Sequence, residues 1–328
     1  MGNYWLEIRE DARVRAETLR ADVLRGLTAR PRWLLPKYFY DAEGSRLFEA
    51  ITRLPEYYLT RAESAILARL APALMRALAP SDIVELGAGS TAKLRRLLAA
   101  RDGGGDGLRY TPVDVDADTL DAAARALVAE WPDVHVHAIA GDFERHLVHV
   151  PPPVGRRLVL FFGSTIGNLD PPERTSLLRQ VQALLGPDDR LLLGVDLVKD
   201  TRTLEAAYDD RAGVTAAFNR NILRVINRGL DADFDAAAFR HHARYDAAAS
   251  RIEMRLVATA AQRVHLRAVG LTLDIEGGED IETERSYKFT RASAAAMLDG
   301  AGLRLDGWHT DEAGRFALLV AGPAGRGR

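Results

Sequence analysis

The residues with the clearest chemical potential surround a short glycine-rich segment. Residues 83–90 read Ile-Val-Glu-Leu-Gly-Ala-Gly-Ser: an apolar stretch with an acid near its end, then Gly87 and Gly89. Glycines let the backbone turn tightly and approach a ligand, and a helix that begins just after them points its N-terminus at that ligand. Doubly wound sheets bind nucleotide-like cofactors at such a turn after the first parallel strand. The segment therefore predicts a cofactor site.

The glycine spacing by itself leaves the cofactor open. Gly87-x-Gly89-x-x-Ala92 also fits the dinucleotide fingerprint, so nicotinamide cofactors and S-adenosylmethionine are equal alternatives for it. Asp114 and Asp116 follow the next apolar stretch, and the Asp114 carboxylate can accept hydrogen bonds from both ribose hydroxyls of either cofactor. The alternative role of either aspartate is to cap a helix.

A later segment favours S-adenosylmethionine. Gly141-Asp142-Phe143 follows the third expected strand, and methyltransferases commonly use such a carboxylate to accept from the adenine amino group. The amide and ring of Phe143 would then lie nearby, although Phe143 can also be plain core. Lys93, in the first turn of the helix after the glycines, would be a solvated lysine in the absence of other information.

Composition narrows the class of protein. The 328 residues can bury one large or two modest domains, and a formal net charge of −2 gives no sign of a nucleic-acid-binding surface. The chain has no cysteine, which excludes disulfides, thiolate nucleophiles and cysteine-ligated metals. No signal pattern or membrane-length apolar run is present. We expect a cytoplasmic monomer that binds small molecules, without nucleic-acid, membrane or metal partners.

Strand and helix patterns alternate through the middle of the chain. The expected strands are 83–86, 110–115, 134–139, 157–162 and 190–195, and the expected helices between them are 92–99, 117–130 and 172–185. Such alternation predicts a parallel sheet with helices on both faces. His135 and His137 share one face of a strand, but no third ligand accompanies them, and we interpret them as solvent-facing residues rather than a metal site.

The flanking regions have different patterns. Residues 11–30 and 61–79 have helical spacing, whereas 37–59 are aromatic-rich and loop-like. After residue 200, helices are expected at 204–208 and 214–227, with possible strands at 251–258 and 264–274. Two final strands, 303–308 and 316–321, would form the closing hairpin typical of a class I methyltransferase sheet.

These patterns predict an α/β fold of the class I methyltransferase, Rossmann-like type, with parallel strands and a closing antiparallel hairpin. An N-terminal helical and aromatic segment (residues 1–80) would contribute to the active site. Residues 81–199 and 287–328 would bind S-adenosylmethionine, and residues 200–286 would form an inserted substrate-recognition domain.

Four further segments carry a specific resemblance, which extends from about residue 20 to residue 320. The chain is similar to the histidine-specific methyltransferases, which trimethylate the α-amine of L-histidine to hercynine in the first step of ergothioneine biosynthesis. The matching segments are Ile51–Tyr58, Phe162–Leu169, Asp196–Asp200 and Ala212–Asn221.

The resemblance assigns roles to individual residues. It implies that the cofactor contacts are Gly87, Lys93, Asp114, Asp142 and Phe143. It implies that Tyr57, Asn168 and Tyr208 are the catalytic residues and hold the carboxylate and amine of the amino acid, and that Glu284 and Ser286 contact the imidazole. It makes Tyr40, Phe48 and Met254 candidates for the pocket wall. Without the resemblance, Asn168 can be a turn cap, Tyr208 a core residue and Glu284 a solvated acid.

The chemistry agrees with these residue types. Glu284 can accept a ring N–H and Ser286 can donate or accept at the other nitrogen, and on an extended segment both would face the same way. The chain departs from the family pattern at Ala88, Arg285 and Tyr287, and the last two would reshape the pocket edge. A methyltransferase for another amino acid or small amine, a non-catalytic S-adenosylmethionine-binding protein and a nicotinamide oxidoreductase are the alternative functions.

Overall fold

The structure, a computed structural model, describes residues 3–10, 12–101 and 107–325, and the chain divides into two compact units. The first, which we name the sheet unit, consists of Met1–Arg9, Leu59–Val198 and Phe289–Arg328. The second unit consists of Glu10–Tyr58 and Lys199–Lys288. The N-terminal segment expected at residues 1–80 therefore contributes to both units, with its helix α3 (Leu59–Leu78) in the sheet unit.

Within the described residues, the sheet unit contains an eight-stranded sheet in the order β1-β5-β4-β3-β6-β7-β14-β13. The strands are β1 (Tyr4–Ile8), β3 (Asp82–Leu86), β4 (Leu108–Asp114), β5 (Val134–Ala140), β6 (Arg157–Phe161), β7 (Arg190–Asp196), β13 (Leu303–Thr310) and β14 (Phe316–Pro323). Neighbours are parallel except that β14 is antiparallel to β7 and to β13. The predicted fold class, a parallel sheet closed by an antiparallel hairpin, is confirmed.

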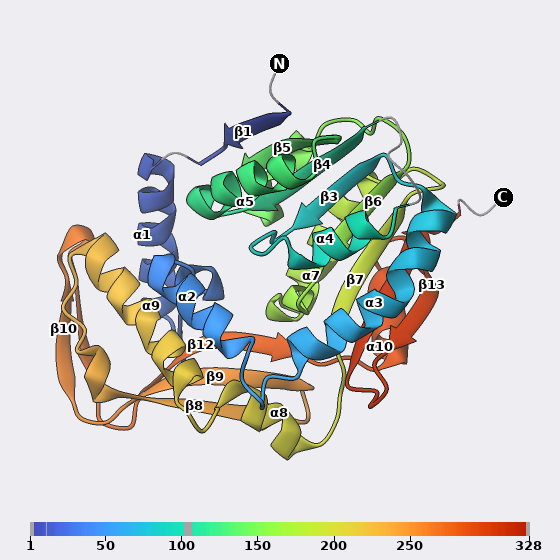
Figure 1. Cartoon of the computed structure of the whole chain (residues 1–328). Coiled ribbons are helices and arrows are strands. Elements are labelled where there is room, and N and C mark those ends of the chain that lie inside the picture. The colour runs from blue at the N-terminus through green and yellow to red at the C-terminus, as the bar shows by residue number, and fades with distance from the viewer. Residues whose placement is uncertain (1–2, 11, 102–106, 326–328) are drawn as a thin grey trace. The chain divides into compact units, whose positions relative to one another are not determined.

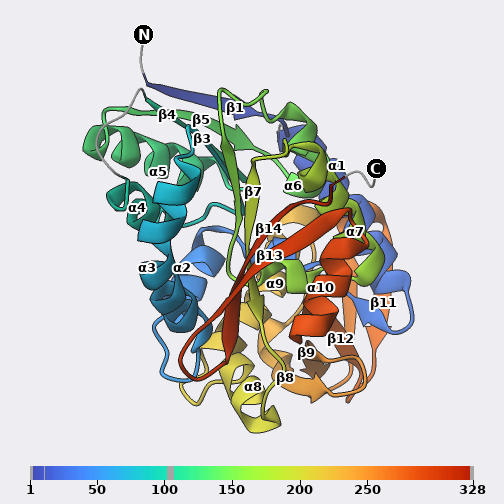
Figure 2. The same cartoon turned by 90° about the vertical axis from the view of Figure 1, so that its right-hand side faces the viewer.

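Helices cover both faces of this sheet. Figure 2 shows α3, α4 and α5 on one face, and α7 and α10 on the other. The bounds are α4 (Ala92–Ala99), α5 (Ala117–Glu130), α6 (Phe143–His146), α7 (Pro171–Ala183) and α10 (Arg291–Asp299), with short 3₁₀ segments η2 (Leu147–His149) and η3 (Thr165–Asn168). Because both faces are covered, the central strands β3 and β6 are buried along their whole length, which explains why apolar residues predominate in them.

Strand β1 was missing from the sequence prediction. It pairs in parallel with β5 and places Glu7 beside His137, whose Nε2 lies 3.1 Å from a Glu7 carboxylate oxygen. His137 is therefore half-buried rather than solvent-facing, whereas His135 is exposed as expected. No group of three or more histidine, aspartate or glutamate side chains in the described part of the chain is arranged to hold a metal ion.

The second unit has a smaller sheet packed against a long helix (Figure 1). In its described residues, four strands run in the order β2-β12-β9-β8 and a separate pair is formed by β10 and β11. The strands are β2 (Arg32–Trp33), β8 (Phe239–Asp246), β9 (Arg251–Ala258), β10 (Gln262–Leu266), β11 (Leu271–Ile275) and β12 (Asp280–Tyr287). The helices are α1 (Ala12–Thr28), η1 (Pro36–Phe39), α2 (Ala42–Ile51), α8 (Thr201–Tyr208), α9 (Val214–Leu230), η4 (Ala236–Ala238) and η5 (Arg267–Val269).

Two expectations for this unit were wrong. Residues 37–59 are not a loop, because Asp41 caps α2 by accepting from the Gly44 N–H at 2.7 Å. Residues 264–274 are not one strand, because η5 and Gly270, with φ of +62°, reverse the chain between β10 and β11. A pattern of apolar residues alone does not reveal a reversal whose turn residues lie inside the run.

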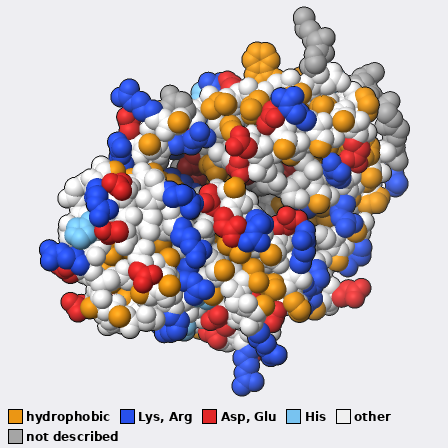
Figure 3. Space-filling view, turned by 60° about the vertical axis from the view of Figure 1, so that its left-hand side comes forward, with side chains coloured by type: hydrophobic (Ala, Val, Ile, Leu, Met, Phe, Trp, Pro, Cys, Tyr) orange, Lys and Arg blue, Asp and Glu red, His pale blue; other side chains and the backbone are white. Residues whose placement is uncertain are grey.

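On the face seen in Figure 3, Lys and Arg side chains lie intermixed with Asp and Glu side chains. This agrees with the small net charge of the chain. Among the described helices, none combines the length and the apolar composition needed to cross a membrane.

Candidate active site

The predicted cofactor residues meet at the carboxyl edge of the sheet unit. The Gly87 N–H, after β3, donates to the Val113 carbonyl of β4 at 2.9 Å, and the Gly141 N–H, after β5, donates to the Asp114 carbonyl at 2.8 Å. Gly87 has φ of +69°, a conformation that disfavours residues with a Cβ. The ends of three neighbouring strands are thus tied together by their backbones, and this brings the three predicted motifs to one place.

The Phe143 ring lies against this edge. A Cβ built on Gly87 would be 3.9 Å from Phe143 Cε1. The Phe143 ring packs edge-to-face against the Phe161 ring, with 5.4 Å between the ring centroids. Phe143 therefore packs partly on the core, as its alternative interpretation predicted, while remaining half-exposed beside the glycine turn. Asp142 is buried and accepts from the Glu144 N–H at 2.9 Å, which caps α6. Its assignment to an adenine amino group stays a prediction.

The two aspartates after β4 have different roles. Asp116 caps α5, since its carboxylate accepts from the backbone N–H of Thr119 at 3.1 Å and from the Thr119 hydroxyl at 2.7 Å. Asp114 accepts the Asp116 N–H at 3.0 Å. Burial raises the pKa of Asp114 to about 6, because the charged carboxylate has lost water. Asp114 is therefore the member of the pair that is suited to bind hydroxyl groups.

The glycine turn fits a nucleoside cofactor with an amino-acid tail. A Cβ built on Gly89 would meet nothing within 4 Å, and the N-cap residue of α4, Thr91, makes no side-chain hydrogen bond to the helix. The Ala92 N–H at the start of α4 donates to Ser90 Oγ at 3.4 Å, and the next amides of this helix N-terminus are suited to donate to a carboxylate. Together with Asp114, these groups match the donors and acceptors of S-adenosylmethionine.

A carboxylate that was not predicted from the sequence organises this edge. Glu63 of α3 is buried, and its two oxygens accept from the Gly163 N–H at 2.9 and 3.1 Å. The same carboxylate forms an ion pair with Lys93, whose Nζ lies 5.1 Å from the centroid of the Phe162 ring. Lys93 is therefore held in place by Glu63 rather than solvated. An acid on the apolar face of a helix, three and four residues before Ile66 and Leu67, was the available signal.

We expect Glu63→Gln to weaken binding of S-adenosylhomocysteine about tenfold, or about 1.4 kcal/mol, because the ion pair that fixes Lys93 is lost. Calorimetry measures this affinity, and thermal unfolding reports any loss of stability. Glu43→Gln is the matched control, since Glu43 forms an exposed ion pair with Arg46 that contributes little. Equal affinities in both variants and the unchanged protein would contradict the role of Glu63.

A second buried acid lies under the turn. Tyr110 donates a hydrogen bond to Glu85 at 2.6 Å, and burial raises the pKa of Glu85 to about 7. Both side chains are almost fully buried. Glu85, the acid before the glycines, thus links β3 to β4 directly below the glycine turn.

Most of the predicted substrate residues lie in the second unit, where four aromatic rings form a row. The ring centroids are 5.6 Å apart for Tyr40 and Phe48, 6.3 Å for Phe48 and Tyr57, and 6.4 Å for Tyr57 and Tyr208. Tyr57 and Tyr208 are buried, and Tyr40 is exposed at one end of the row. Two of the expected pocket-wall residues, Tyr40 and Phe48, therefore lie in one row with the two predicted catalytic tyrosines.

A β-bulge in β12 determines which way the predicted imidazole contacts face. Glu282 pairs with Arg255 of β9, but Glu284 pairs with Met254, so the register shifts by one residue. Buried Thr283 lies at the shift and donates from its hydroxyl to the Met254 carbonyl at 3.1 Å. Glu284 and Ser286 consequently share the face of Met254, as the sequence predicted, whereas Glu282 lies on the other face.

The Glu284 side chain is half-buried and forms no hydrogen bond with another described residue. Burial raises its pKa to about 7, and the charge of Lys288 acts in the opposite direction. Among the described residues, no N–H or O–H group is within hydrogen-bond distance of this carboxylate. Half-buried Glu284 is therefore not a fully solvated acid, and its carboxylate is suited to accept an N–H from a ligand.

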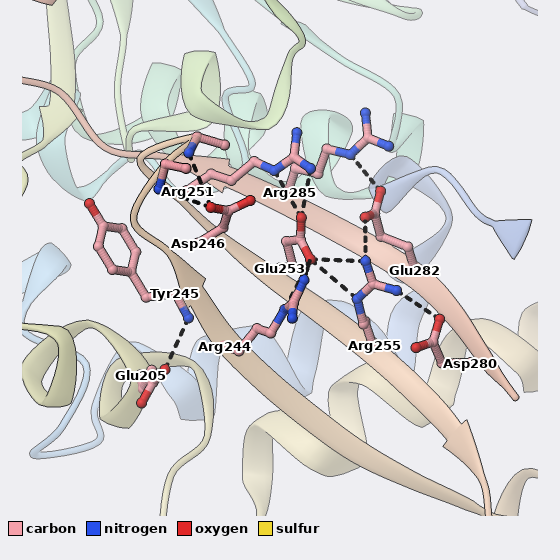
Figure 4. Close-up of polar contacts among 12 residues, drawn as sticks. Glu205, Arg244, Tyr245, Asp246, Arg251, Glu253, Arg255, Asp280, Glu282 and Arg285 are labelled. Carbon is pink, nitrogen blue, oxygen red and sulfur yellow. Dashed lines mark hydrogen bonds and ion pairs between the residues drawn. The ribbon is translucent and has the colours of Figure 1, made fainter. Parts of the chain in front are cut away.

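Arg285 and Tyr287 do not border the predicted imidazole contacts, contrary to the sequence analysis. Arg285 donates to Glu282 at 2.5 Å and Tyr287 accepts from Arg251 at 2.9 Å, both on the opposite face of the sheet. Figure 4 shows that face, where three arginines converge on Glu253. They are Arg244, Arg251 and Arg255, at 3.1, 2.6 and 2.9 Å. This network of ion pairs joins β8, β9 and β12 on the face of the sheet opposite Glu284.

Asn168 is the one predicted substrate residue found in the sheet unit. It ends η3, after the loop whose Gly163 N–H is held by Glu63. Its side chain is half-buried and makes no hydrogen bond within the described residues, so the alternative role as a turn cap is wrong. Its amide is suited to bind a ligand from the same unit as the cofactor residues.

Comparison with known proteins gives matches over most of the chain. A family model described as "Histidine-specific methyltransferase, SAM-dependent" matches residues 19–323. Histidine N-alpha-methyltransferase of Mycolicibacterium smegmatis is 51% identical over 306 residues, 93% of this chain and 95% of that protein. The enzyme of the same name from Mycobacterium tuberculosis is 50% identical over 303 residues, 92% and 94% of the two chains. Ergothioneine biosynthesis protein 1 of Neurospora crassa is 35% identical over 202 residues, 60% of this chain and 23% of that protein.

Proposed function

Because this chain belongs to the histidine-specific, S-adenosylmethionine-dependent methyltransferases, we propose that it methylates the α-amine of L-histidine three times to give hercynine. L-histidine and its mono- and dimethylated forms are its substrates in this proposal, and the reaction is the first step of ergothioneine biosynthesis. The Neurospora relative is named for that pathway. The proposal includes a monomeric enzyme that acts in the cytoplasm.

The observation that supports histidine as the substrate is the Glu284 carboxylate beside Ser286. A neutral imidazole has one N–H and one bare nitrogen, so it needs an acceptor and a donor. Glu284 supplies the acceptor, and the Ser286 hydroxyl can supply the donor. Such a site rejects apolar side chains by large factors, because its own polar groups would be left unpaired.

The α-amine requires different partners from the ring. It must be neutral to attack, and a free α-amine titrates near ~8, so no strong base is obligatory at mildly alkaline pH. Three successive methylations also require the amine to turn and to release a proton each time. The hydroxyls of Tyr57 and Tyr208 and the amide of Asn168 are weak polar partners that allow this better than a carboxylate.

The cofactor would be held by Gly87, Lys93, Asp114, Asp142 and Phe143, and when bound it supplies a methyl group on a sulfonium with a good leaving group. The protein then has mainly to exclude water and to align the amine with that methyl group. Asp114 would accept from the ribose hydroxyls, and Lys93, held by Glu63, would bind the carboxylate of the amino-acid tail.

A substrate competition tests the proposal. Histidine, its mono- and dimethylated forms, tryptophan and free lysine are offered together with S-adenosylmethionine, and the methylated products are quantified. We expect histidine and its mono- and dimethylated forms to be methylated, and tryptophan and lysine to remain unmethylated. Preference for tryptophan would contradict the assignment of Glu284 and Ser286. Calorimetry with S-adenosylhomocysteine and with NADH shows which cofactor the protein binds. Binding of NADH but not of S-adenosylhomocysteine would contradict the proposed methyltransferase activity.

A further inference from the structure

Lys288 lies beside the predicted substrate residues of the second unit. It follows the end of β12, and its N–H donates to the Ser250 carbonyl at 2.7 Å. With Glu284 and Ser286 it continues the alternation along one face of the strand. Its side chain is only 3% exposed. A buried ammonium is unfavourable unless hydrogen bonds replace its water, so the partners of Lys288 are informative.

Two of those partners are hydroxyls already assigned to the substrate. Lys288 Nζ donates to Tyr208 Oη at 2.8 Å and to Ser286 Oγ at 2.8 Å, and the two oxygens are themselves 2.8 Å apart. The ammonium also lies 4.4 Å from the centroid of the Tyr208 ring, a favourable cation–π distance. The three side chains therefore form a closed hydrogen-bonded triangle.

An ammonium only donates, so both hydroxyl oxygens must accept from Lys288, and their protons must point elsewhere. One proton forms the bond between the two oxygens, and the other is directed out of the triangle. If Tyr208 donates to Ser286, the outward proton belongs to Ser286; otherwise it belongs to Tyr208. In both arrangements, one hydroxyl donor is presented together with the Glu284 acceptor.

Resting on the proposed function, we propose that Lys288 is a positioning residue that selects neutral histidine, because it leaves Tyr208 and Ser286 with one outward-directed proton between them. The pair thus presented, one donor and one acceptor, is complementary to the two nitrogens of a neutral imidazole. Without Lys288, the hydroxyl proton that is not shared between the two oxygens could also point to the place of the ammonium, and the substrate would have to order it on binding.

Lys288→Met tests this role, because methionine keeps the length of the side chain but removes its charge and donors. We expect the KM for histidine to rise at least tenfold, with kcat changed less than threefold and the affinity for S-adenosylhomocysteine changed less than twofold. Lys199→Met is the matched control, since Lys199 also donates to a tyrosine hydroxyl, that of Tyr58 at 2.7 Å, and lies 4.7 Å from its ring. We expect the KM of this control to change less than twofold.

A chemical rescue distinguishes an effect of the Lys288 ammonium from an effect of side-chain packing at this position. The chain has no cysteine, so Lys288→Cys can be alkylated at that position alone with 2-bromoethylamine in denaturant and refolded, which restores an ammonium on a side chain of similar length. Wild type taken through the same steps is the control. We expect the raised KM of Lys288→Cys to return to within threefold of this control after alkylation.

The results distinguish the two proposals. A wild type that does not methylate histidine overturns the proposed function, and the inference with it. An active wild type with an unchanged KM in Lys288→Met overturns only the inference. So does a folded, alkylated protein that is not rescued, or a parallel loss of cofactor affinity in Lys288→Met.

Discussion

Glu284→Ala is expected to lower kcat/KM for histidine about a hundredfold, mainly through KM. The ring N–H of bound histidine would lose its charged acceptor, and a hydrogen bond to a charged group contributes about 1.5–3 kcal/mol. Glu284 belongs to the second unit and the cofactor residues to the sheet unit, so we expect the affinity for S-adenosylhomocysteine to stay within twofold. Initial rates at saturating cofactor and calorimetry measure the two effects.

A pH profile gives an independent check on Glu284. Since burial raises its pKa to about 7, lowering the pH through 7 converts the acceptor to a protonated carboxyl, and kcat/KM should fall. The imidazole and α-amine of histidine titrate in every variant. We therefore expect Glu284→Gln to remove one ionisation from the acid side of the profile while keeping those of the substrate. Profiles of identical slope would contradict a role for the Glu284 charge.

In contrast to Glu284→Ala, Asp114→Asn is expected to weaken binding of the cofactor and not of histidine. The affinity for S-adenosylhomocysteine should fall about 30-fold, or about 2 kcal/mol, because an ionised acceptor for the ribose hydroxyls becomes a neutral amide. The KM for histidine at saturating cofactor should change little. Burial raises the pKa of Asp114 to about 6, so the wild-type affinity should also decline as the pH falls through 6, and the variant should lack this decline.

Asp116→Ala provides the control for Asp114→Asn. Its carboxylate caps α5, so we expect a loss of stability of about 1 kcal/mol with a smaller effect on cofactor affinity. If the two variants lost stability and cofactor affinity equally, the division of roles between these neighbouring aspartates would be wrong.

The sheet unit was predictable because its elements have local signals. Apolar runs of strand length alternate with capped helices, and motifs at strand ends meet at one edge in any parallel sheet. This reasoning located Gly87, Asp114 and Phe143 correctly relative to one another. It could not find β1, whose pairing with β5 depends on residues about 130 positions away. Glu63 was missed because its partners, Lys93 in α4 and Gly163 in the loop after β6, lie far from it in the sequence.

The second unit was harder to predict because its key features are not local. The face of Glu284 depends on a register shift beside Thr283, and nothing in the residue types marks that shift. Arg285 and Tyr287 were wrongly placed beside the imidazole contacts because they alternate with Glu284 and Ser286 along β12 and therefore lie on its opposite face. The role of Lys288 depends on Tyr208, which is 80 residues away. The resemblance to a family supplied Tyr208 and Glu284, but it gave no reason to include the lysine.

The most direct test of the proposed function is to identify the product. The purified protein is incubated with L-histidine and S-adenosylmethionine carrying a labelled methyl group, and the products are fragmented by mass spectrometry. We predict that all three labelled methyl groups are on the α-nitrogen of one product, with mono- and dimethylated histidine as transient species. Labelled methyl on an imidazole nitrogen, or no labelled histidine while another amino acid is methylated, would contradict the account.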